Sequence, residues 1–317
     1  MMNKTINETV RSVMIGHAVG DALGVPVEFC SREELLEKPV TDMVGYGVYD
    51  VPAGAWSDDT SMSLCALDAL RREDWKWEHI MANFIAWLEK GEYSPIGECF
   101  DVGRGCLDAI LSYCRGGGNA LSCGGVGEYS NGNGSLMRIH PFVLYAYANR
   151  LPLDEQLALV DDGSKMTHAH ERSRLACLIY TFVLDILLRD PSKDAVRQGL
   201  KAAAEHLGEC GEMTHYKRLF EGDIASLQSC DIKSSGYVVD TLEAALWCLL
   251  TTESYKECVI RAVNLGGDSD TTAAVAGGLA GALYGYGSIP EEWKGKLMKR
   301  DYIEELCDRA VKAWGNA

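Results

Sequence analysis

The stretches WSDDTSMSLCALDAL, residues 56–70, and GGDSDTTAAVAGGLAGAL, residues 266–283, have the same layout. Each begins with a cluster of acidic and hydroxyl side chains and continues as an apolar run of small residues with helical spacing. Ser, Thr and Asp are common at helix starts because their side chains accept hydrogen bonds from free backbone N–H groups. The two stretches therefore predict two helices that begin at similar acidic clusters.

Glycine recurs at every fourth position in two predicted helices. Gly16, Gly20 and Gly24 form one row, and Gly277 and Gly281 belong to the other. A glycine inside a helix costs about 1 kcal/mol relative to alanine. Residues without side chains, however, allow a neighbouring helix to approach closely. We therefore expect these two helices to be central and tightly packed.

Helical periodicity extends over most of the 317 residues, and runs that alternate apolar and polar residues are nearly missing. The sequence therefore predicts an all-α protein. No linker divides the chain and the glycine-rich stretch 116–134 is interpreted as a long loop, so residues 1–317 are expected to form one compact domain. Helices are expected at 10–23, 60–72, 75–90, 102–114, 136–148, 171–188, 193–207, 238–251, 254–263, 271–284 and 303–314.

Composition excludes several classes of function. The net charge of −16 repels phosphate backbones, so a broad nucleic-acid surface is not expected. The longest apolar stretch is shorter than the ~20 residues of a membrane span, and the first residues lack the apolar core of a signal peptide. The 12 cysteines include no CxxC pair and are interpreted as reduced thiols. We expect a cytoplasmic protein, with a monomer as the default state.

The two acidic clusters have two interpretations. Helix capping explains one acidic side chain at a helix start, but each cluster has more than one. Carboxylates packed so densely repel one another, and the helix dipole offsets only about 0.3–1 kcal/mol for each. Two divalent cations such as Mg²⁺, which prefer oxygen ligands, resolve this repulsion if the clusters meet in space. The candidate metal ligands are Ser57, Asp58, Asp59, Asp268, Asp270 and Thr271.

Two further stretches are candidates for substrate contacts. NGNGSLMRIHPF, residues 131–142, is a loop that opens a predicted helix, where backbone N–H groups can hold a phosphate. No GxSxG motif surrounds Ser135, so a nucleophilic role is not indicated. THAHERS, residues 167–173, places His168 and His170 at a helix start without the HExxH pattern of a zinc site. Capping or a surface position is the alternative for at least one of these histidines.

Five short motifs, in order and spanning nearly the whole chain, resemble those of the ADP-ribosylglycohydrolases. One such motif alone carries little information, whereas five in the same order are specific to the family. They are GxxxGDAxGxPxE at 16–28, SDDT at 57–60, NGxxMR at 133–138, TH at 167–168 and GGDxDT at 266–271.

This resemblance implies an all-α, single-domain fold with a dinuclear Mg²⁺ or Mn²⁺ site formed by the six candidate ligands. It implies an acidic side chain near the metals at Glu28 and a substrate contact at Asp101. The stretch 104–106 departs from the family pattern, which leaves the leaving group open. The other substrate-binding residues that it implies are Asn133, Gly134 and Ser135, for the diphosphate, and His168.

The resemblance predicts hydrolysis of the glycosidic bond between ADP-ribose and an acceptor, most simply an arginine on a protein. Asp59, Asp270 and Glu28 are the candidate catalytic residues, with an aspartate ligand or Glu28 as the general base. A small ADP-ribosyl molecule is the other candidate partner. The alternatives are a hydrolase of serine-linked ADP-ribose or of O-acetyl-ADP-ribose, and a catalytically silent ADP-ribose-binding protein.

Overall fold

The computed structural model describes residues 5–116, 118–208 and 211–315, and these residues form helices joined by loops. No strand occurs among them, and only isolated bridges join Gly125 to His168 and Gly132 to Tyr237. The all-α prediction is therefore confirmed. The α-helices are α1 Ile6–Gly24, α2 Arg32–Glu37, α3 Asp58–Leu70, α4 Trp77–Lys90, α5 Arg104–Cys114, α6 His140–Ala148, α7 Leu153–Lys165, α8 Glu171–Arg189, α9 Lys193–Leu207, α10 Lys217–Phe220, α11 Val238–Thr251, α12 Tyr255–Val263, α13 Ser269–Tyr284, α14 Glu291–Lys296 and α15 Arg300–Trp314.

Short 3₁₀ turns connect several of these helices. Their bounds are η1 Val25–Val27, η2 Ala120–Ser122, η3 Leu136–Arg138, η4 Gly211–Tyr216, η5 Ile224–Ser226, η6 Ser229–Asp231 and η7 Tyr286–Ser288.

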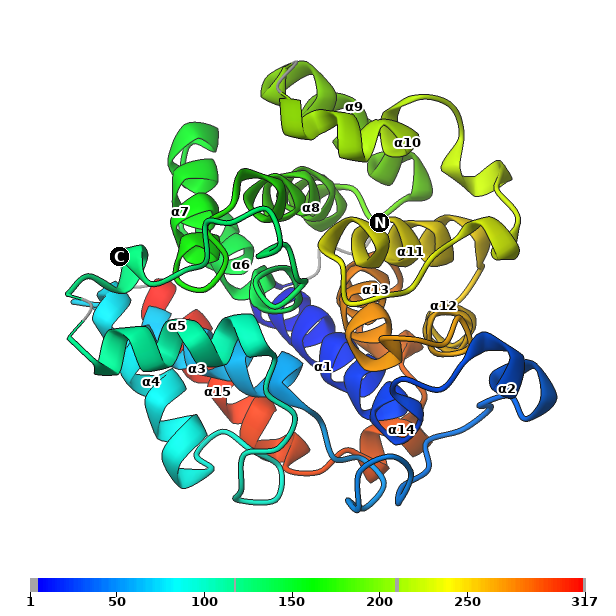
Figure 1. The fold of residues 1–317 in the computed structure, drawn as a ribbon, viewed down its shortest axis with the longest axis horizontal. Helices are drawn as coiled ribbons and strands as arrows, with labels where there is room; N and C mark the ends of the chain where they lie inside the picture. The colour runs from blue at the N-terminus through cyan, green and yellow to red at the C-terminus, as the bar shows by residue number, and fades with distance from the viewer. Residues whose placement is uncertain (1–4, 117, 209–210, 316–317) are drawn as a thin grey trace.

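Helices α1 and α13 pack against each other at the centre of the molecule, as Figure 1 shows. A Cβ atom at Gly20 would lie 2.1 Å from the Ala273 carbonyl oxygen, and one at Gly16 would lie 2.5 Å from the Gly277 carbonyl oxygen. The two helices thus approach backbone to backbone, which only glycine allows at these positions. This confirms the expectation that the helices with glycine rows are central and tightly packed.

The remaining helices surround this pair and share one hydrophobic core with it. Helices α3, α6 and α15 pack on one another beside α1, whereas α8, α11 and α12 pack on α13 (Figure 1). Buried side chains of this core run from Val10 near the start of α1 to Trp314 at the end of α15. Segments that lie far apart in the sequence therefore hold the starts of α3 and α13 in place.

The sequence analysis did not predict the helix α7. Its sequence LDEQLALVDDGSK has few apolar residues, and only Leu157 and Val160 of these are buried. The predicted helix at 136–148 divides into η3 and α6. Pro141, which lacks an N–H group, stands at the start of α6 and cannot continue the preceding turn.

The glycine-rich stretch 116–134 is, over its described residues, a loop that contains the 3₁₀ turn η2; Gly117 lies outside them. All eleven cysteines of the described part are free thiols, and Cys210 lies outside it. Among the described helices, none has the length and apolar character needed to span a membrane.

Candidate active site and metal centre

A cavity of about 550 Å³ lies between the starts of α3, α5 and α13 and the loop before η3. Its walls include many of the residues that the sequence predicts for the site. Ser57, Asp59 and Asp270, which are at most 1% exposed, and Ser135 are not part of its lining. The predicted residues that do line it are Glu28, Asp58, Asp101, Asn133, Gly134, His168, Asp268 and Thr271.

The start of α3 is fixed by Asp21 on α1. One Asp21 oxygen accepts the backbone N–H of Ser57 at 2.9 Å, and the other accepts the backbone N–H and the hydroxyl of Thr60 at 3.0 and 2.6 Å. Ser57 also caps α3, because its hydroxyl accepts the backbone N–H of Asp59 at 3.3 Å. Asp21 therefore replaces missing hydrogen-bond partners at a helix end.

The start of α13 is fixed by a glycine turn. Gly266 and Gly267 have φ values of 74° and 67°, a backbone region that glycine adopts readily. The Gly267 carbonyl accepts the N–H of Phe29 at 2.7 Å, and the Gly267 N–H donates to the Cys30 carbonyl at 2.8 Å. This pairing places Glu28, the neighbour of Phe29, beside the first residues of α13.

The two acidic clusters meet. The Thr271 hydroxyl of α13 donates to Asp59 Oδ1 of α3 at 3.2 Å. Oxygens of Asp21, Asp59 and Asp270 lie within 4.8 Å of one another, and so do oxygens of Glu28, Asp101 and Asp270. Asp270 thus belongs to two sets of three carboxylates, each of a composition that could hold a cation.

Asp58 and Asp268 flank these sets. Asp58 Oδ2 accepts the backbone N–H of Gly103 at 3.1 Å, which joins α3 to the start of α5. Asp268 Oδ2 accepts the side-chain amide of Asn133 at 2.9 Å. The predicted metal ligands are therefore brought together, although Asp58 and Asp268 lie outside the two closest triads.

Several carboxylate oxygens of this cluster are buried without a hydrogen-bond partner among the described residues: Glu28 Oε2, Asp59 Oδ2, Asp268 Oδ1 and Asp270 Oδ1. None of the ion pairs formed in the described part involves these carboxylates. Burying an unpaired carboxylate is costly. Carboxylate and hydroxyl oxygens are ligands that hard divalent cations prefer, so the residues present fit such ions.

The same burial and crowding shift the acid–base behaviour of the cluster. Burial, together with the charges of Asp101 and Asp268, raises the pKa of Glu28 to about 8. Burial and the neighbouring carboxylates also raise the pKa of Asp58, Asp59 and Asp270 well above the usual range. Each of these shifts favours the neutral acid, which is the response expected of carboxylates gathered without a cation.

The sequence analysis did not assign a role to two residues of this site. Asp21 holds α3, and burial raises the pKa of its carboxyl to about 6. Its position directly after Gly20 of the glycine row was the available signal. The Tyr49 hydroxyl interacts with the carboxylates of Asp101 and Glu28, but no motif surrounds it. A half-buried tyrosine in an irregular loop gives no sequence signal of its own.

The predicted substrate-binding residues divide into two groups. Asn133 and Gly134 line the cavity, and so does His168, which is 4% exposed. Ser135 is fully buried, and its hydroxyl accepts from Ser164 at 2.9 Å and lies 3.5 Å from Cys177 Sγ. The Ser135 side chain is therefore held in the core beside the loop rather than in the cavity wall.

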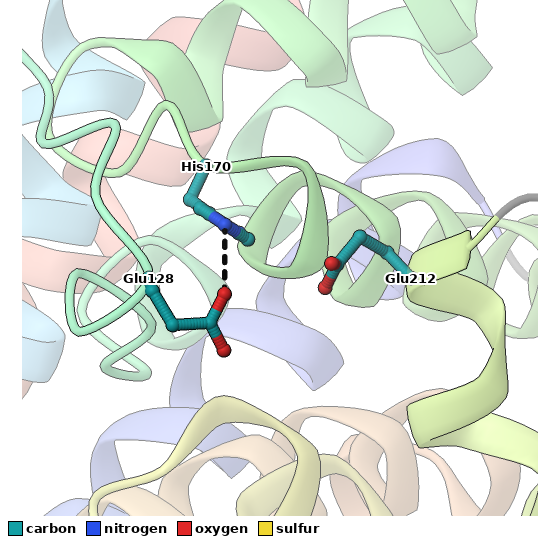
Figure 2. Close-up of side chains that lie close together, drawn as sticks. All are labelled: Glu128, His170 and Glu212. Atoms are coloured by element: carbon teal, nitrogen blue, oxygen red, sulfur yellow. Dashed lines mark ion pairs between the residues drawn. The ribbon is translucent and has the colours of Figure 1, made fainter.

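A second group of side chains consists of Glu128 in the loop before η3, His170 and Glu212 (Figure 2). Arg172 donates to Glu128 Oε1 at 2.8 Å and to Glu212 Oε2 at 2.7 Å. His170 Nδ1 accepts the Arg172 backbone N–H at 3.2 Å as the cap of α8, and its Nε2 lies 3.6 Å from Glu128. One arginine pairs with both carboxylates, so this group is an ion-pair network that ties Glu128, the neighbour of the cavity residue Tyr129, to α8.

Two helix starts thus present a carboxylate cluster to one cavity, an arrangement that could hold the cations of a metal-assisted hydrolase. The sequence profile of one family, ADP-ribosylglycohydrolase, matches residues 2–317. The chain therefore belongs to the ADP-ribosylglycohydrolase family, and the predicted resemblance is confirmed.

Individual relatives agree with this assignment. The chain is 32% identical over 303 residues to an ADP-ribosylarginine hydrolase, Tri1, of Serratia proteamaculans, covering 95% of this chain and 78% of that protein. It is 32% identical over 316 residues to an ADP-ribosyl-[dinitrogen reductase] glycohydrolase of Rhodospirillum rubrum, covering 99% and 97%. A solved structure described as an ADP-ribosylglycohydrolase-related protein complex superimposes with a TM-score of 0.80 at 30% identity, covering 98% and 99%.

Proposed function

We propose that this chain hydrolyses the bond between ADP-ribose and an arginine side chain of a protein, with two divalent cations, Mg²⁺ or Mn²⁺, in its acidic cluster. The observation that carries the proposal is the meeting of the α3 and α13 carboxylates at one cavity, with unpaired buried oxygens. The similarity to an ADP-ribosylarginine hydrolase supports arginine as the acceptor.

The cations would be held by the side chains that begin α3 and α13. Asp270 would take part in holding either cation, because its carboxylate belongs to both sets of three. A divalent cation, when bound, polarises the oxygen atoms it contacts and makes water more acidic. The proposed ligands are Ser57, Asp58, Asp59, Asp268, Asp270 and Thr271.

The chain's own residues supply proton transfer and orientation. The bond from the ribose C1″ to the guanidinium nitrogen breaks as a water oxygen bonds to C1″, through an oxocarbenium-like state. Glu28, in its carboxylate form, is positioned to accept the water's proton, because it lines the cavity and its Oε2 is unpaired. The proton then passes to the released guanidine, which restores Glu28. Asn133, Gly134 and His168 lie on the cavity wall and would hold the rest of ADP-ribose.

Electrostatics support a cationic leaving group. Glu28, Asp58, Asp101 and Asp268 all line the cavity, and the chain carries a net charge of −16. A guanidinium is attracted to such a field, whereas a serine or acetyl ester is neutral. Both kinds of substrate carry the same negative diphosphate, so added salt should lower the rate with the arginine-linked substrate relative to the rate with the serine-linked one.

The test is release of free ADP-ribose from ADP-ribosylarginine with Mg²⁺ and then with excess chelator. We expect metal-dependent release that Asp58→Asn abolishes and that Asp301→Asn, a change at a 91% exposed side chain, leaves intact. Release from serine-linked ADP-ribose or O-acetyl-ADP-ribose alone would replace arginine as the acceptor. ADP-ribose binding without release from any of the three would show a silent binding protein.

A further inference from the structure

Arg138 is a charged side chain buried in the protein without a carboxylate partner in the described part of the chain. It is 0% exposed, and its Nε and Nη1 atoms have no hydrogen-bond partner there. Its guanidinium lies 5.1 Å from the centre of the Phe84 ring. Burying an arginine in this way is costly, so an arginine at this position needs a reason beyond packing.

The hydrogen bonds of Arg138 are made by its Nη2 atom and connect it to the cavity wall. Its Nη2 donates to the Gly163 carbonyl at 3.2 Å and to Thr167 Oγ1 at 2.6 Å. Thr167 Oγ1 in turn lies 2.9 Å from Nδ1 of His168. The ring of His168 borders the cavity. Arg138, Thr167 and His168 therefore form a chain from the core to the cavity wall.

The chemistry of the three groups sets the direction of the hydrogen bonds. Arginine can only donate, so it occupies one lone pair of the Thr167 hydroxyl. A hydroxyl that accepts from a cation becomes a stronger donor and a weaker second acceptor. The Thr167 proton is therefore available to an acceptor, and His168 Nδ1 is such an acceptor when it is the unprotonated nitrogen.

Cys106 is the competing partner for the Thr167 proton, because the two side chains interact. Its thiol, however, faces the Gly134 carbonyl at 3.6 Å, and a thiol sulfur is a weak acceptor. His168 Nδ1 is thus the better acceptor for Thr167.

The other ring nitrogen, Nε2, faces a gap left by glycines. Added Cβ atoms at Gly105, Gly132 and Gly134 would lie 2.8, 3.4 and 3.5 Å from His168 Nε2. Gly105, Gly132 and Gly134 also line the cavity. Burial, with the charge of Arg138, lowers the pKa of His168 to about 3, so the ring is neutral and carries one proton.

We propose that Arg138 and Thr167 are positioning residues that hold His168 as the Nε2–H tautomer and direct this donor at an oxygen of ADP-ribose in the cavity. The tautomer is a property of the free protein, whereas its use in binding rests on the proposed function. The two parts are therefore tested separately.

The tautomer is measured by long-range ¹H–¹⁵N correlation spectra of the ¹⁵N-labelled, ligand-free protein, with His168→Phe to assign the ring. We expect an unprotonated Nδ1 and a protonated Nε2 in the wild type, in Thr167→Ser and in Arg138→Lys. Thr167→Val and Arg138→Met should show a mixture of tautomers. A wild-type ring that is protonated at Nδ1 would overturn the proposal.

Binding is measured as the affinity for ADP-ribose by calorimetry. Thr167→Val should weaken binding about three- to tenfold, as for the loss of one hydrogen bond, and Thr167→Ser should restore it. In the His168→Phe background, Thr167→Val should have no further effect, because Thr167 acts through the histidine. Additive losses in this double-mutant cycle would overturn the proposal, because they would show that Thr167, which itself lines the cavity, does not act through His168. A wild type that has the expected tautomer but does not bind ADP-ribose would instead refute the proposed function and the binding part, leaving the tautomer assignment intact.

Discussion

Replacing Asp59 with asparagine should stabilise the metal-free protein while removing its activity. Asp59 Oδ1 accepts from Thr271, and an amide oxygen can keep that bond. Asp59 Oδ2 is buried and unpaired. In Asp59→Asn a donor NH₂ group takes this position, and a carboxylate oxygen from each of Asp21 and Asp270 lies within 4.8 Å of one of the two Asp59 oxygens. The substitution therefore removes a charge and creates a hydrogen-bond donor at no change in shape.

The size of the effect follows from the spacing of the carboxylates. Oxygens of Asp59, Asp21 and Asp270 lie within 4.8 Å of one another, and two unit charges at that distance repel by about 3.5 kcal/mol at an effective dielectric constant near 20. Proton uptake limits this repulsion, because keeping an ordinary aspartate neutral at pH 7 costs about 4 kcal/mol. We expect a gain of about 2 kcal/mol in the free energy of unfolding, or about 3 °C in Tm for a chain of this size.

The assay is thermal unfolding in excess chelator and in saturating Mg²⁺, with Asp301→Asn as the exposed control. In chelator Asp59→Asn should melt above the wild type. In Mg²⁺ the order should reverse, because only a protein that binds the ions is stabilised by them, and turnover should be lost. If Asp59→Asn melts below the wild type in chelator, the account of a strained, metal-free carboxylate cluster is wrong.

Two further predictions concern pH and packing. In chelator, the free energy of unfolding should fall as the pH rises from about 4.5 to about 8, because folding raises the pKa of Glu28 from 4.5 to about 8 and the folded protein therefore holds this proton more tightly. Mg²⁺ should flatten this pH dependence, and equal slopes with and without Mg²⁺ would contradict the prediction. Gly20→Ala should destabilise the fold by about 1–3 kcal/mol despite better helix propensity, because its Cβ would lie 2.1 Å from the Ala273 carbonyl oxygen. Gly295→Ala in α14, where a Cβ meets nothing within 4 Å, is the matched control, and an equal change in both unfolding midpoints would refute the packing argument.

The sequence predicted the parts of this protein that depend on local chemistry. The acidic residues that open α3 and α13 stand next to strong helix signals, so their position at helix starts was readable from their neighbours. The glycine rows at every fourth residue predicted that α1 and α13 are central and tightly packed, whereas their contact with each other was found in the structure. The meeting of the two clusters, joined by Thr271 and Asp59, required the structure.

What the sequence did not predict depends on contacts between distant segments. Tyr49 reaches Asp101 and Glu28 from a loop without regular structure. In the sequence, Arg138 is only one residue of a motif. Its hydrogen-bond partner Thr167 lies 29 residues further along the chain, so the sequence did not predict their contact. Ser135 directly precedes the 3₁₀ turn η3, and its side chain lies in the core. No residue pattern indicates the orientation of this turn, so the sequence did not predict the position of the side chain.

Close helix packing and the acidic cluster depend on each other. A Cβ at Gly24 of α1 would lie 2.3 Å from the Cα of Asp270, so the glycine row continues to the site itself. From the same helix Asp21 holds the start of α3, which carries Asp59. The contact between α1 and α13 thus fixes the carboxylates of two helix starts closer together than their charges favour. A core that holds them there without a cation leaves unpaired oxygens ready to bind one, and the stability lost in the metal-free state is the measurable consequence.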